Sequence, residues 1–177
     1  ILKKITIHFH SKGYCATSMQ DIVDITGLNR SSIYNTFGSK LELFIICFEK
    51  CEANYKTEVQ KIILESTNPI KSLTSIFELS IKQSINGYLT PNYISELKNK
   101  ETIIRELIIK QHKYLLDLFS NIVKRGQTLG SINNSKSTNQ YTLYLLNSYQ
   151  GLKFITHLSI DDNSLKNIIQ NTVSLLE

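Results

Sequence analysis

The sequence predicts an all-α protein of about nine helices, in which a three-helix head at the N terminus precedes a larger helical body. Apolar residues recur at helical spacing through much of the 177-residue chain, as at Leu41, Phe44, Ile45 and Phe48. Only two prolines and seven glycines interrupt these periodic segments. No segment shows a convincing alternation of the kind that a β-strand would require.

Three short helices are predicted in the head. The first covers residues 1–12, and Ser18 with Asp21 has the spacing of a capping box that starts the second. Gly27 stands where that helix can end in a left-handed residue, and Asn29 can cap a short third helix. Two helices that meet at a glycine turn, the second one short and polar on its outer face, are typical of a helix-turn-helix. The second helix of that motif enters the DNA major groove.

Six further helices are predicted in the body. A second capping box at Ser39 starts the first of them, and Pro69 suits the first position of the next. Gly126 or Gly130 ends the longest periodic segment, and Asp161 can cap the final helix. In chain order, these helices are expected at about residues 40–65, 70–89, 93–99, 101–125 and 138–158 and in the segment after residue 161.

The charge of the chain is concentrated at its N-terminal end. The whole sequence has 20 basic and 15 acidic residues, a formal net charge of +5. Residues 1–40 hold five basic and two acidic residues, so +3 of that charge lies there. Such a distribution suits a polyanionic partner such as DNA.

The run from Gly13 to Phe44 reads G-Y-C-A-T-S-M-Q-D-I-V-D-I-T-G-L-N-R-S-S-I-Y-N-T-F-G-S-K-L-E-L-F. Its glycine, threonine-rich helix start, glycine–hydrophobic turn, Ser/Thr–hydrophobic–Tyr run and Ser-Lys pair resemble the DNA-binding segment of TetR-family transcriptional regulators. The resemblance implies a helix-turn-helix domain over residues 1–45 and an effector-binding and dimerisation domain over residues 46–177. It implies a homodimeric repressor that a small-molecule effector releases from a palindromic double-stranded DNA operator.

Ten residues match DNA-contacting positions of that family. The resemblance implies that one set holds phosphates, namely Thr17, Ser18, Ser32, Tyr34 and Lys40. It implies that the other set faces base edges, namely Gln20, Arg30, Ser31, Asn35 and Thr36. Among these, Arg30 has the chemistry for a bidentate contact to guanine.

The resemblance also implies a ligand pocket in the body. Its expected lining is aromatic, comprising Phe77, Tyr88, Tyr93, Tyr114, Phe119, Tyr144 and Tyr149. The alternative is that these rings simply form the core. The ionisable residues of the most apolar stretches can all face solvent on helical periodicity, and they are Glu78, Lys82, Arg105, Glu106 and Lys153. A largely hydrophobic ligand is therefore expected, because an unpaired buried charge is costly.

The last two predicted helices are unusually apolar for elements at the edge of a domain. An exposed apolar stripe of this kind usually marks an oligomer interface, and the resemblance implies that these helices pair with their copies as a four-helix bundle. The residues expected at this dimer interface are Leu152, Ile155, Ile168 and Ile169. The alternative is that they complete the core of a single chain.

Other classes of function receive little support from the sequence. It has no glycine-rich phosphate loop, metal-ligand cluster or nucleophile motif, so neither an enzyme nor a cofactor or metal is expected. Cys15, Cys47 and Cys51 suggest a reducing compartment, with a redox-sensing Cys47–Cys51 pair as an alternative. A protein that acts through protein partners is a further alternative. The absence of long apolar runs and of a signal-peptide pattern predicts a cytoplasmic chain without membrane contact.

Overall fold

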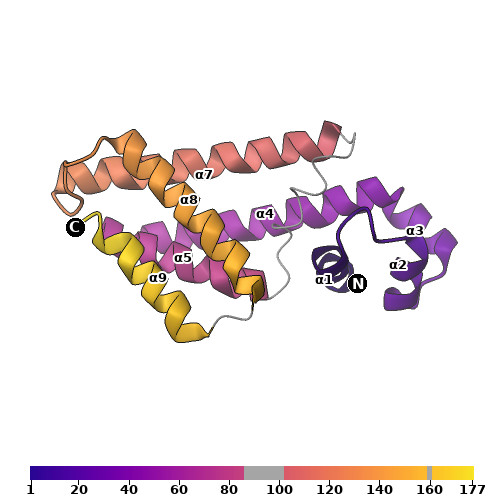
Figure 1. Ribbon diagram of the computed structural model, residues 1–177. Helices are drawn as coiled ribbons and strands as arrows, with labels where there is room; N and C mark the ends of the chain where they lie inside the picture. Colours follow the sequence, from indigo (N-terminus) through magenta and orange to yellow (C-terminus); the bar gives the residue numbers. More distant parts are fainter. Residues whose placement is uncertain (86–101, 159–160) are drawn as a thin grey trace. The chain divides into compact units, whose positions relative to one another are not determined.

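The computed structural model describes residues 1–85, 102–158 and 161–177 (Figure 1). In these ranges it contains eight α-helices, one short 3-10 helix and no strand, which confirms the predicted all-α class. The predicted helix at 93–99 lies outside the described residues. The elements are α1 Leu2–Lys12, α2 Met19–Thr26, α3 Arg30–Phe37, α4 Lys40–Glu65, α5 Pro69–Ile85, α7 Thr102–Leu129, α8 Thr138–Ile155, η1 Thr156–Leu158 and α9 Asp162–Ser174.

The predicted helix boundaries in the head are confirmed by the side chains that cap them. The Ser18 hydroxyl accepts a hydrogen bond from the Asp21 amide (3.1 Å), and the Asp21 carboxylate accepts one from the Ser18 amide (2.6 Å). The same reciprocal pair joins Ser39 and Glu42 at the start of α4. Gly27 ends α2 at φ +70°, a left-handed conformation that costs glycine least. These local bonds fix where α2 and α4 begin and where α2 ends.

Two glycines have different roles at the end of α7. Gly130, one of the two predicted stops, follows the last residue of the helix at φ +73°, so α7 extends past the range of 101–125 expected for it. Gly126 lies inside the helix, where an added Cβ would come within 2.5 Å of the Ile132 side chain. Because Ile132 is fully buried, Gly126 allows the loop after α7 to pack back against the helix.

Two compact units divide the chain. The first comprises Ile1–Lys56 and, among the described residues of α7, those up to Ile108; the second comprises Thr57–Ile85 and Ile109–Glu177. Helix α4 contributes its first part to one unit and its last part to the other. The predicted domain boundary at residue 45 therefore falls within a continuous helix. None of the described helices is long and apolar enough to cross a membrane.

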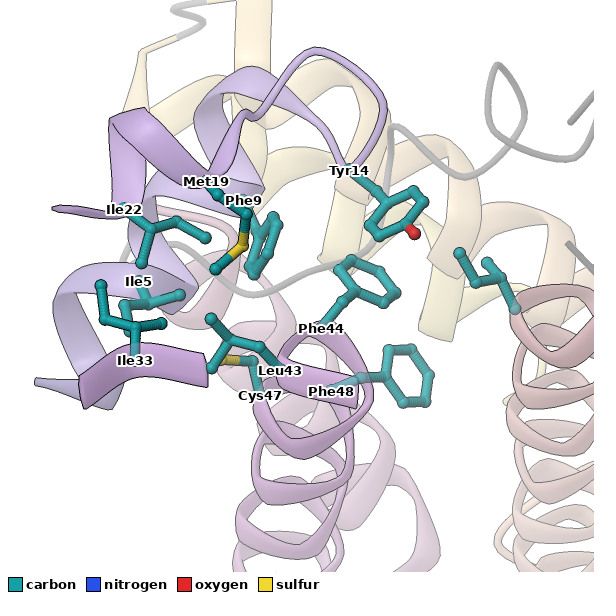
Figure 2. Close-up of a cluster of buried hydrophobic side chains, with 11 residues drawn as sticks. Ile5, Phe9, Tyr14, Met19, Ile22, Ile33, Leu43, Phe44, Cys47 and Phe48 are labelled. Atoms are coloured by element: carbon teal, nitrogen blue, oxygen red, sulfur yellow. The ribbon is translucent and has the colours of Figure 1, made fainter. Parts of the chain in front are cut away.

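The core of the first unit gathers side chains from α1, α2, α3 and the start of α4 (Figure 2). Phe44 is at its centre, with its ring 5.2 Å from that of Phe9 and 5.1 Å from that of Tyr14. Ile33 projects from α3 into the same cluster and is fully buried. The helix-turn-helix is thus held by apolar contacts to helices on both sides of it in the sequence.

In the second unit, α5 packs against both α8 and α9. Phe77 of α5, Phe119 of α7 and Tyr149 of α8 form one aromatic cluster, with ring centroids 5.5–6.0 Å apart. All three side chains are almost completely buried. This cluster joins three helices that are far apart in the sequence, and it forms the centre of the body.

Asn133, in the loop between α7 and α8, ties the C-terminal end of the chain to that loop. Its side-chain amide donates to the Leu176 carbonyl (3.0 Å), and its own backbone amide donates to the same oxygen (2.8 Å). Its side-chain oxygen accepts hydrogen bonds from the Tyr141 hydroxyl (2.6 Å) and the Ser135 amide (2.9 Å). One polar side chain therefore satisfies groups from three separate parts of the body.

We expect Asn133→Ala to lower the free energy of unfolding by about 2 kcal/mol, because it leaves several partly buried groups without their partner. The change can be measured by urea denaturation followed by circular dichroism. The neighbouring Asn134 is exposed, and Asn134→Ala should change the stability by less than about 0.5 kcal/mol. Equal effects of the two substitutions would show that the Asn133 bonds do not support the fold.

Candidate nucleic-acid interface

Helix α3 presents one polar face to solvent and one apolar face to the core. Ile33 is fully buried, whereas the side chains that are exposed include most of those predicted to face DNA, namely Arg30, Ser31, Tyr34, Asn35 and Thr36. Ser32 is half-buried. The structure therefore brings the predicted base-reading residues of α3, a helix of eight residues, together on its accessible surface.

The start of α3 is well ordered by local contacts. The Asn29 side chain accepts a hydrogen bond from the Ser32 amide (2.8 Å), as the sequence predicted. The Arg30 guanidinium lies 5.7 Å from the centre of the Tyr34 ring, one turn further along the helix. This cation–π contact holds the arginine against the helix surface without using its N–H donors. Arg30 can therefore approach a base edge with its hydrogen-bonding groups available.

Gln20 and Asp24 form a second pair one turn apart, on α2. Both are exposed, and the Gln20 side-chain amide donates to an Asp24 carboxylate oxygen at 2.8 Å. Gln20 is one of the residues expected to face base edges, whereas no role was predicted for Asp24. The spacing of a glutamine four residues before an aspartate could have indicated the pair.

Two of the predicted phosphate-binding hydroxyls are used inside the head. Thr17 is 1 % exposed, and its hydroxyl donates to the Gly13 carbonyl (2.7 Å). The Ser18 hydroxyl donates to the Asp21 carboxylate (2.7 Å) within the capping box. Their hydroxyl protons therefore stabilise the loop between α1 and α2.

Lys40 also makes contacts within the head. Its ammonium group donates to the carbonyl oxygens of Tyr14 (3.0 Å) and Thr17 (2.9 Å) and lies 4.4 Å from the centre of the Tyr14 ring. These partners are 26 and 23 residues away in the sequence. No local pattern could have revealed this contact, which joins the α1–α2 loop to the first turn of α4.

An ion pair between Lys12 and Asp21 (2.8 Å) joins the end of α1 to the first turn of α2. The hydrogen bond from Lys12, followed by those from the Ser18 amide and hydroxyl, holds the pKa of Asp21 well below its usual range. The sequence indicated Asp21 only as part of a helix cap. The structure shows that the same carboxylate also connects two helices of the head.

The three cysteines are free thiols in different environments. Cys15 is exposed, Cys51 is half-buried, and Cys47 lies fully buried in the core of the first unit. Burial raises the pKa of the Cys47 thiol, which lowers the fraction of reactive thiolate at neutral pH. This environment is unfavourable for the redox-sensing alternative.

The predicted pocket residues in the body do not share one environment. Phe77, Phe119 and Tyr149 pack against one another as described above, and Tyr114 and Tyr144 are half-buried. Tyr88 and Tyr93 lie outside the described residues. The structure therefore shows that three of the rings form the core, which was the alternative interpretation of the aromatic pattern.

The predicted exposure of the charged residues was correct except at one position. Four of the five are exposed, namely Glu78, Lys82, Arg105 and Glu106. The prediction for Lys153 was wrong, because this lysine is only 3 % exposed and its ammonium lies 5.4 Å from the centre of the Tyr149 ring. The body thus contains a buried cationic group next to its aromatic cluster.

The apolar residues of the last two helices divide between the core and the surface. Leu152 and Ile169, predicted at the dimer interface, are 1 % and 2 % exposed within their own chain, while Ile155 and Ile168 are half-buried. The exposed apolar residues in this part of the chain are Leu143, Phe154, Leu158 and Leu175. Periodicity alone could not separate these sets, because α8 is apolar on more than one side.

Comparison with known proteins supports the same interpretation of the head and of the fold. Residues 1–46 match the model of bacterial regulatory proteins of the tetR family. The chain is 24 % identical to the uncharacterised helix-turn-helix-type transcriptional regulator YezE of Bacillus subtilis, covering 96 % of this chain and 90 % of YezE. It is 23 % identical to the helix-turn-helix-type transcriptional repressor DhaR of a Mycobacterium species, covering 92 % of this chain and 82 % of DhaR.

A similar solved structure is that of a cysteine mutant of the TetR-family transcriptional regulator CifR in a complex with 26-bp double-stranded operator DNA. Its TM-score is 0.80, the sequence identity is 14 %, and the match covers 99 % of this chain and 94 % of that one. At this level of identity the similarity concerns the fold.

We expect acid to weaken the head through Asp21. Because the pKa of this carboxyl is lower in the folded head than in the unfolded chain, the unfolded chain binds more protons at low pH. The stabilisation is complete above the unfolded pKa of roughly 4 and is lost as the pH falls towards the folded value.

The difference in melting temperature between the wild type and Asp21→Asn should therefore be largest near pH 6 and should shrink as the pH falls towards 2. Calorimetry across that range measures it. The control is Asp117→Asn, which changes an exposed acid of α7. A difference that is independent of pH would mean that the ionised form of Asp21 does not stabilise the head.

Proposed function

We propose that this chain, a TetR-family transcriptional regulator by its head sequence and its fold, is a homodimeric repressor. Two copies of α3 would enter successive major grooves of a roughly palindromic operator. A small, largely hydrophobic ligand bound in the body would then favour a state with lower DNA affinity. The observation that carries this proposal is the polar face of α3, which is exposed while Ile33 anchors the opposite face.

The chemistry of that face suits duplex DNA. Arg30 provides paired donors for guanine, and Asn35 provides a donor and an acceptor that match adenine. Tyr34 and the hydroxyls of Ser31 and Thr36 can reach phosphates or base edges. The structure of CifR with its operator gives a precedent in the same fold, and the DhaR relative is described as a repressor.

In this proposal, Lys40 does not bind a DNA phosphate directly. Two of its N–H groups are engaged by the carbonyls of Tyr14 and Thr17. We propose that it supports DNA binding by fixing the loop from which α2 begins, and that the charge for the phosphates comes mainly from other basic groups of the head. Its loss should then weaken binding to all DNA while leaving the salt dependence unchanged.

The exposed apolar face of α8 supports a dimer. Leu143 and Phe154 are exposed and lie on the same side of α8 by its periodicity, and Leu158 is exposed in η1. An added Cβ at Gly151 would meet nothing within 4 Å. A glycine on an exposed apolar face permits close approach of a second helix. We therefore propose that α8 pairs with α8 and α9 of a second copy through this face.

The proposed ligand is largely hydrophobic but has one polar end. The aromatic cluster around Tyr149 makes this part of the body apolar, and Lys153 brings its ammonium group to 5.4 Å from the centre of the Tyr149 ring. A ligand with a single polar or acidic group fits this environment better than a multiply charged metabolite. Because α4 belongs to both units, a change in the body that shifts this helix would reach the head.

The test of the proposed function is selection of DNA by the purified protein from a random duplex pool. We expect enrichment of sequences with two inverted half-sites, and gel retardation of the enriched DNA. A protein that acts only through protein partners would enrich no sequence, so this outcome would favour that alternative. Compounds that stabilise the protein in a thermal screen can then be tested for release of the bound DNA.

The first prediction from this function concerns Arg30. Arg30→Ala should remove the preference for guanine at one position of each half-site, a discrimination of about 1–3 kcal/mol for a bidentate contact. Binding titrations with single-base variants of the selected site measure it. Lys50→Ala, which removes an exposed positive charge from α4 of the same unit, should leave the preference intact. Equal losses on selected and random DNA would assign Arg30 to the phosphate backbone.

The second prediction concerns the dimer. Phe154→Glu should give a folded monomer with greatly reduced operator affinity, because it places a charge on the exposed apolar face of α8. A charge at Leu152 would be less informative, since that side chain belongs to the core of its own chain.

Sedimentation velocity at micromolar concentration, with circular dichroism as the check of folding, measures this effect. Asn121→Glu introduces the same charge at an exposed position of α7 and should preserve the dimer. A dimeric Phe154→Glu protein with normal DNA affinity would place the interface elsewhere.

A further inference from the structure

We infer that Asp24 is a positioning residue that sets the orientation of the Gln20 amide and thereby makes the head prefer adenine over guanine at one base pair of each half-site. This inference rests on the proposed function, because it requires that α2 lies at the DNA. Asp24 itself would make no base contact and would act through its neighbour.

The orientation of Gln20 follows from the chemistry of its partner. The side-chain nitrogen of Gln20 lies 2.8 Å from an Asp24 carboxylate oxygen, and both residues are exposed one turn apart on α2. An ionised carboxylate can only accept hydrogen bonds, so the amide must turn its NH₂ group towards Asp24. The side-chain carbonyl and the second N–H of Gln20 then remain for another partner.

One remaining donor and one acceptor match adenine. In the major groove adenine presents the N7 acceptor beside the N6 amino donor, the pair that a glutamine amide recognises through two hydrogen bonds. Guanine presents two acceptors, N7 and O6, in the same places. Reading both would require both N–H groups of Gln20, and one of them is held by Asp24. The Asp24 contact therefore disfavours guanine at this position.

The charge of Asp24 has a second consequence. The nearby carboxylate of Asp21 is paired with Lys12 at 2.8 Å, whereas no basic group of the described residues lies within ion-pair distance of Asp24. An unpaired negative charge on the DNA-facing side of α2 repels phosphates of any sequence. Asp24 thus lowers affinity for DNA in general while it improves the choice between bases.

The two effects can be separated with two substitutions. Asp24→Ala removes both the charge and the acceptor, whereas Asp24→Asn removes the charge but keeps a side-chain oxygen that can accept the Gln20 N–H. Glu49→Ala is the matched control, since Glu49 is an exposed acid on α4 of the same unit. The base pair in question is identified first, as the one whose preference is lost in Gln20→Ala.

We expect the wild type to bind the adenine form of the site roughly tenfold more tightly than the guanine form, as for a bidentate contact. In Asp24→Ala this ratio should fall towards one, while affinity for random duplex DNA rises several-fold. Asp24→Asn should show the same rise on random DNA but should keep much of the ratio. Glu49→Ala should leave the ratio unchanged.

Two independent measurements keep the inference testable. In the free protein, the two side-chain amide protons of Gln20 should have well-separated NMR resonances, and the separation should decrease in Asp24→Ala. The melting temperature of that variant should remain close to that of the wild type. The inference would be overturned if Asp24→Ala kept the wild-type ratio of affinities for the adenine and guanine forms. It would also be overturned if that ratio were lost together with a large drop in melting temperature.

A different result would refute the proposed function itself. If the wild-type protein enriches no sequence from a random pool, then the DNA-binding proposal itself is wrong. If the wild type enriches a site and Asp24→Ala keeps the same preference at every position, the DNA-binding proposal stands and the role of Asp24 is refuted.

Discussion

The contact between Lys40 and the α1–α2 loop is the constraint on which the geometry of the head depends. This loop leaves the carbonyls of Tyr14 and Thr17 pointing towards the first turn of α4, and the ammonium of Lys40 satisfies both of them at 2.9–3.0 Å. The Tyr14 ring lies against the same ammonium and also packs edge-on against Phe44. One lysine therefore connects a polar loop to the apolar core. The direction in which α2 leaves the loop, and with it the placement of α3, depends on this connection.

Two aspartates on α2 show how position decides the role of a residue type. Asp21 faces the N-terminal end of the helix and Lys12, so its charge caps the helix and joins α1 to α2. Asp24 lies one turn later on an exposed surface, where its hydrogen bond goes to Gln20. The first carboxylate stabilises the fold, and the second restricts a side chain that we place at the DNA. A count of charges in the head cannot distinguish these roles.

The local features of the fold could be predicted from the sequence, and the long-range ones could not. The caps at Ser18, Asn29 and Ser39 depend on residues within four positions of one another, and all were predicted. The Asn133 bonds to Leu176 span 43 residues, and no local pattern identifies such partners. At the candidate interface, the exposure predicted for the polar residues of α3 is confirmed except at Ser32, which is half-buried. The internal use of Thr17 was missed because burial of a hydroxyl depends on packing.

The end of α8 reverses the usual distribution of polar and apolar residues. Lys153 is 3 % exposed and Phe154 is 61 % exposed, although burial favours phenylalanine by roughly 1.5–3 kcal/mol and disfavours a charge. For a monomer, the exposed phenylalanine gains none of this stabilisation. The positions of both residues fit a body that binds a second copy and a ligand, as proposed above. In the proposed dimer, Phe154 would become buried as a second copy covers the outer face of α8. Lys153 places its ammonium group 5.4 Å from the centre of the Tyr149 ring, beside the apolar region proposed for the ligand. The same short stretch of helix thus supports both the proposed dimer and the proposed choice of ligand.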